Sequence, residues 1–101
     1  MHLVTILLPI TRSDGSPQPR TLFAKLRTEL IERFGGVTFF SRAPAEGLWE
    51  DEGKVEHDQI VLVEVLVQSL ERHYWTELRT RLERDFAQDE ILIRASAVER
   101  L

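Results

Sequence analysis

Residues 60–67, IVLVEVLV, place a carboxylate in the middle of the most apolar stretch of the chain. Successive side chains of an extended strand point to opposite faces of its sheet. One face of this stretch therefore carries four valines, at positions 61, 63, 65 and 67. The other face carries Ile60, Leu62, Glu64 and Leu66. We predict that the valine face packs against helices and that Glu64 lies on an open face.

Two segments on either side of this strand show the period of an amphipathic helix. Between Arg20 and Phe34, leucines recur at every fourth position, and Gly35 can end the helix in a left-handed conformation. The second helix follows Ser69, which we expect to cap it, and its apolar stripe is Leu70, Tyr74, Leu78, Leu82 and Phe86, flanked by Trp75. On its outer face we expect Arg81 to pair with Glu77 and Asp85, its neighbours at helical spacing.

Four segments are typical of strands. They are residues 3–8, Val37–Arg42, Gln59–Val67 and Ile91–Val98. Pro9 ends the regular pairing of the first strand, because proline has no N–H to donate. The order β-α-β-β-α-β predicts one ferredoxin-like domain over residues 1–101, an α+β plait with both helices on one face of a four-stranded antiparallel sheet. Right-handed crossovers give the strand order 4-1-3-2.

Composition narrows the classes of function. A net charge of −4 argues against a nucleic-acid binder, and the absence of cysteine excludes disulfides and thiolate chemistry. The opening MHLVTILLPI lacks the basic flank and cleavage site of a signal peptide, and no apolar run reaches the ~18 residues that span a membrane. We therefore expect a cytoplasmic protein with no membrane or nucleic-acid partner. No phosphate loop, dinucleotide fingerprint or nucleophile elbow is present, and we expect no cofactor.

The same alternation, applied to every strand, defines the open face of the predicted sheet. Its polar members are Thr5, Thr38, Arg42, Glu64, Arg94 and Ser96. Its apolar members are Leu3, Leu7, Phe40, Ile60, Leu62, Leu66 and Leu92. This much exposed apolar surface is typical of an interface, so we predict a homodimer formed face to face. If the dimer buries Glu64, its carboxylate needs an ion-pair partner, and Arg94 and Arg42 are the candidates. The alternative is that the open face is partly exposed to solvent and Glu64 is hydrated.

The connection from Ala43 to His57 is the second candidate site, because long loops often bind ligands. Leu48 and Trp49 can resume strand pairing within it before Gly53 turns the chain. The connection also carries Glu46. Next to one another, His57 and Asp58 could act as a general base with an orienting carboxylate, or both could be metal ligands. A solvated acidic hairpin with Trp49 against the sheet explains the same residues more simply, and we expect no metal site.

The stretch RFGGVTFFSRAPAEGLWEDEG, from Arg33 to Gly53, resembles a recurrent stretch in a family of bacterial proteins of about this length that has no assigned function. The end of the chain, DEILIRASAVERL, is similar as well. The signature residues are Arg42, Pro44, Glu46, Gly47 and Trp49. The resemblance implies a bacterial origin and a role for the 43–57 connection beyond chain geometry, but no catalytic residue.

Two functions fit these observations. The first is a non-catalytic homodimer that binds a small ligand or a protein partner. The second is a cofactor-independent enzyme of the dimeric α+β-barrel kind, acting on a small aromatic or carbonyl compound, which is a fold-level analogy. A deep apolar pocket lined by Arg42, His57 and Glu64 would favour the enzyme, whereas a sheet face filled by a second copy would favour the binding protein.

Overall fold

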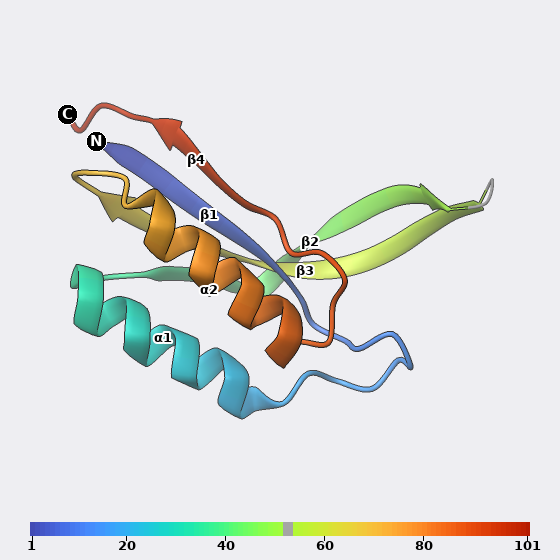
Figure 1. Ribbon diagram of the computed structural model, residues 1–101. Coiled ribbons are helices and arrows are strands. Elements are labelled where there is room, and N and C mark those ends of the chain that lie inside the picture. The colour runs from blue at the N-terminus through green and yellow to red at the C-terminus, as the bar shows by residue number, and fades with distance from the viewer. Residues whose placement is uncertain (52–53) are drawn as a thin grey trace.

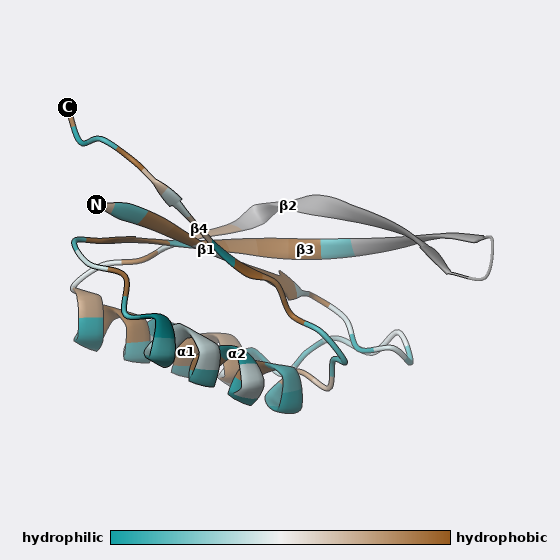
Figure 2. Ribbon diagram, turned by 45° about the horizontal axis from the view of Figure 1, so that its top comes forward, coloured by the Kyte–Doolittle hydropathy of each residue, from teal (hydrophilic) through white to brown (hydrophobic). Residues whose placement is uncertain are grey.

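The protein forms a four-stranded antiparallel sheet with two helices packed on one of its faces (Figures 1 and 2). The computed structural model describes residues 1–51 and 54–101, and the side chains of residues 41–58 lie outside that description. Its elements are β1 (His2–Pro9), α1 (Arg20–Phe34), β2 (Thr38–Asp51), β3 (Lys54–Val67), α2 (Arg72–Asp85) and β4 (Ile93–Ala97). The strand order β2-β3-β1-β4 is the predicted 4-1-3-2 read from the other edge, which confirms the ferredoxin-like plait.

The central strands β1 and β3 supply the sheet side of the core. The four alternating valines of β3 are buried, and Val63 has no exposed surface. The register places Val63 opposite Ile6, and Val65 opposite Val4, so buried side chains face one another across the strand pair. The predicted division of β3 into a covered valine face and an open face is therefore confirmed.

Helix α1 has the bounds that the leucine period predicts. Leu26 and Leu30 are buried against the sheet. Gly35 ends the helix with φ of 83°, and its N–H donates to the Ile31 carbonyl at 2.8 Å. A side chain with a Cβ is strained in this left-handed conformation, which explains glycine at this position.

Helix α2 begins at Arg72, so the prediction that Ser69 caps it is wrong. Glu71 occupies the cap position without a side-chain hydrogen bond, and Ser69 is exposed in the bend before it. The bend lets Leu70 pack against the core before the helix starts. Further along, the ring of Trp75 stacks on Phe34 of α1 with centroids 5.1 Å apart and planes 9° apart.

A polar network on the outside of the helix layer joins the two helices. Arg81 donates to both carboxylate oxygens of Glu29, at 2.6 and 2.8 Å, and Tyr74 Oη donates to the same carboxylate at 2.7 Å. The predicted pairs of Arg81 with Glu77 and Asp85 are therefore wrong, because a two-point contact across the helices is stronger than a single contact along one helix. The hydrogen bond from Arg81 holds the pKa of Glu29 below its ordinary value of 4.5, and burial raises the pKa of Tyr74.

The connection expected from Ala43 to His57 corrects a third prediction. Instead of a long loop, residues 45–51 pair with residues 54–60 after an irregularity between Phe40 and Ala45. The two strands thus continue as a hairpin that projects beyond the helices (Figure 1). Leu48 and Trp49 do resume pairing, opposite His57 and Glu56.

The edge strand β4 is shorter than the predicted Ile91–Val98. Ile91 is buried, but it precedes the strand, and four of the five strand residues are exposed. Ala95 and Ala97, which alternation assigned to the covered face, are exposed because the helices leave this edge bare. Within the described part of the chain, neither helix is long and apolar enough to cross a membrane.

The core assignment predicts a large difference between two adjacent residues of α1. Leu30→Ala removes a fully buried side chain and is expected to lower the free energy of unfolding by about 2–5 kcal/mol. Ile31→Ala, at a side chain that is 45% exposed, is the matched control and is expected to cost less than half as much. Urea denaturation followed by circular dichroism measures both, and equal losses would contradict the assigned helix orientation.

The Glu29–Arg81 contact predicts a pH-dependent contribution to stability. Because the folded pKa of Glu29 is lowered, the contact stabilises the protein above pH 4.5, and this gain is lost as pH falls through the folded pKa. Glu29→Gln should therefore lower stability by about 1 kcal/mol near pH 7 and by less at pH 3. Urea midpoints at both pH values test this, with Glu32→Gln on the same helix as control. A deficit of Glu29→Gln that is the same at both pH values would contradict it.

Candidate functional site: the open face of the sheet

A single polar row crosses the open face from edge to edge. The register pairs Thr5 of β1 with Arg94 of β4 on one side and with Glu64 of β3 on the other. Glu64 in turn pairs with Thr38 of β2. Adjacent strands lie about 4.8 Å apart, so Arg94 and Glu64 flank Thr5 at nearly equal distances. Among the described side chains, the face therefore carries a base and an acid placed symmetrically about β1.

Apolar side chains flank this polar row on both sides. Toward one end, Leu62 lies opposite both Leu7 and Phe40, and toward the other, Leu3 lies opposite both Leu66 and Ser96. Three of the apolar side chains on this face are strongly exposed: Phe40 at 44%, Leu66 at 45% and Leu92 at 51%. Neither helix covers this face in the single chain, since both lie on the opposite side of the sheet (Figure 2).

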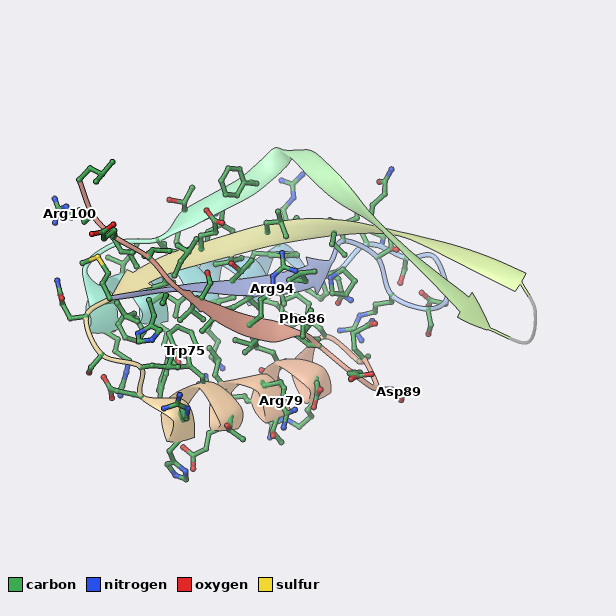
Figure 3. All side chains as sticks on the ribbon, turned by 90° about the horizontal axis from the view of Figure 1, so that it is seen from above. Trp75, Arg79, Phe86, Asp89, Arg94 and Arg100 are labelled. Atoms are coloured by element: carbon green, nitrogen blue, oxygen red, sulfur yellow. The ribbon has the colours of Figure 1, made fainter. Side chains whose placement is uncertain are left out.

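The centre of the face is nevertheless partly sheltered. Thr5 is only 7% exposed, because longer side chains surround it. Figure 3 looks down on the sheet from the uncovered side and shows Arg94 over it, whereas Trp75 and Arg79 lie on the α2 side. Among the side chains that the structure describes, no ion pair joins Arg94 to Glu64 within the chain, so their pairing across a dimer stays a prediction. The other expected partner, Arg42, lies outside the described side chains.

The remaining predicted site residues belong to the hairpin. Glu46 pairs with Gln59 in the register, and Trp49 pairs with Glu56, next to the pair of Leu48 and His57. Their side chains are outside the description, so roles for Arg42, Glu46, Trp49 and His57 stay predictions. The described side chains, which do not include those of the acid-rich hairpin, gather no group of three or more metal-ligating residues.

A groove between α2 and the edge of the sheet escaped the sequence analysis. It encloses about 200 Å³ and is lined by Val4, Leu70, Arg72, Trp75, Thr76, Ile93, Arg94 and Ala95. It exists because the helices do not cover β4, and Ala95 was the signal in the sequence, since its small side chain fills little space. The indole Nε1 of Trp75 is buried without a hydrogen-bond partner, but it has no accessible surface to offer a ligand. A larger hollow, about 520 Å³, lies along the exposed side of α1, away from the open face.

Comparison with solved structures identifies the class of fold. The divalent cation tolerance protein CutA1 from Thermus thermophilus superposes with a TM-score of 0.64 at 17% identity, covering 99% of this chain and 86% of that one. A phage SAM lyase in complex with S-methyl-5'-thioadenosine gives 0.63 at 15% identity, covering 94% and 79%. The PII-like protein CutA from Nostoc sp. PCC 7120 gives 0.59 at 15% identity, covering 98% and 82%.

At these identities the likeness shows the fold alone. The chain is a small α+β protein of the ferredoxin-like plait, with the same arrangement of elements as these neighbours. No family model and no curated protein matches the sequence.

Proposed function

We propose that the protein acts as a homodimer formed through the open sheet face, and that this dimer binds a small ligand or a protein partner. The observation that carries the proposal is the combination of exposed Phe40, Leu66 and Leu92 on the face that the helices leave bare. Contiguous apolar patches on a single subunit are typical of interfaces. The hairpin of β2 and β3 extends the same sheet and enlarges the surface available for contact.

The size of the face sets the expected strength of the dimer. Four strands at about 4.8 Å spacing and the eight residues of β1 at about 3.4 Å each give a face of roughly 500 Å². Two such faces bury roughly 1,000 Å², which is at the lower limit of specific protein–protein interfaces. We therefore expect dissociation constants near micromolar rather than nanomolar.

Support for ligand binding comes from the structural neighbours. The phage SAM lyase, which shares this fold, was solved in complex with S-methyl-5'-thioadenosine. A sheet-and-helix body of this kind can thus hold a small molecule while its elements keep the same order. In this chain, the groove beside Trp75 encloses about 200 Å³, which is less than the roughly 300–1,000 Å³ of most ligand sites. A ligand of ordinary size bound in this groove would therefore need a second copy to complete its site.

Sedimentation velocity tests the dimer directly. The wild-type protein is expected to shift from monomer to dimer between about 0.1 and 100 μM. Leu66→Glu places a charge in the apolar part of the interface and is expected to keep the protein monomeric over this range, because an unpaired buried charge is costly. Thr80→Glu, on the exposed side of α2, adds the same charge and should leave association unchanged.

Circular dichroism should show both variants folded, since neither position is buried. A wild-type protein that stays monomeric at the highest concentration would overturn the proposal. Equal association of wild type and Leu66→Glu would exclude this face as the interface.

A further inference from the structure

The open face is self-complementary in charge when a second copy lies on it. The row that crosses the sheet has Arg94 one strand to one side of Thr5 and Glu64 one strand to the other. A two-fold axis between two such faces can run in any direction parallel to the sheets, and its two limiting directions are along the strands and across them. The charges distinguish between these orientations.

In the first orientation, the axis runs parallel to β1 and passes above Thr5. The β4 side of each face then lies over the β3 side of the other copy, and each row of side chains lies over the same row of the other copy. Arg94 of each copy then lies opposite Glu64 of the other, so the contact forms twice. The next row fits the same axis. Leu92, which is 51% exposed, lies beside Leu7 and accepts a hydrogen bond from its N–H, so it comes to lie opposite Leu62 of the other copy.

An axis perpendicular to the strands gives the opposite result. Each side of the face then meets the same side of the other copy, which places Arg94 on Arg94 and Glu64 on Glu64. Like charges brought together in an interface weaken association, so this arrangement is disfavoured.

We propose that the dimer has its two-fold axis along β1 and is held in register by two reciprocal Arg94–Glu64 ion pairs. This inference rests on the homodimer of the preceding section and adds its geometry and its specificity. Apolar contacts provide most of the attraction, while the ion pairs favour this orientation over the perpendicular one, which brings like charges together. The occupant of the face is therefore a second copy of this chain.

Charge reversal tests the pairing between chains. Glu64→Arg gives a face with two bases, and Arg94→Glu gives a face with two acids. Each variant alone is expected to dimerise at least about tenfold more weakly than wild type. An equimolar mixture of the two variants should form a heterodimer within about threefold of wild-type affinity, because both contacts are then base to acid again. Sedimentation velocity with one variant fluorescently labelled measures this.

The mixture separates a contact between chains from one within a chain. If Arg94 and Glu64 stabilised only their own subunit, each variant would stay monomeric after mixing. A charge-reversal pair on the exposed side of α2, Glu77→Arg and Arg79→Glu, is the matched control, and each of these variants should dimerise like wild type. Adding Leu66→Glu to either partner should abolish the heterodimer.

The outcomes also separate this inference from the proposed function. A monomeric wild type would overturn both. A wild-type dimer that Leu66→Glu dissociates, together with charge variants that mixing fails to restore, would leave the interface in place and overturn the two-fold geometry.

Discussion

The packing of alternating valines on β3 beneath the helices is the constraint on which the rest of the structure depends. Val61, Val63, Val65 and Val67 are all buried, and a one-residue shift of register would exchange them for the opposite face. Burial of one face therefore fixes the position of every side chain on the other. Glu64 is on the open face because its neighbours in sequence are buried in the core. The same alternation places Arg94 and Thr5 on this face, and the register between strands aligns them with Glu64 in one row.

The helix layer is held together by contacts that link elements distant in the chain. Phe34 stacks on Trp75, and Arg81 reaches from α2 to Glu29 of α1. Both contacts lie on the side of the molecule away from the open face, so the helices are fixed without using any group that the face presents. The open face is thereby left free for the association that we propose.

The features that the sequence predicted well are those with a local physical cause. The bounds of α1 follow from the leucine period and from Gly35, whose positive φ a side chain would oppose. The prediction failed where competing partners existed. Ser69 was a possible cap for α2, but Leu70 packs against the core and the helix begins at Arg72. Arg81 pairs with Glu29 of the other helix and not with its two acidic neighbours on α2. The segment 43–57 was expected to be a loop because its composition is polar and rich in turn formers, although Leu48 and Trp49 pointed to the pairing that continues the sheet.

The sequence by itself determined the order of the elements and which side chains of each strand share a face. It also determined that the carboxylate at position 64 lies on the face opposite the valines. These are consequences of periodicity, which acts within a few residues of each position. Only the tertiary structure decided that Arg94, Thr5, Glu64 and Thr38 form one row, that β4 remains uncovered, and that a groove lies beside Trp75. Register between strands and contact between helices depend on residues far apart in the chain, and the pattern of one segment does not carry that information.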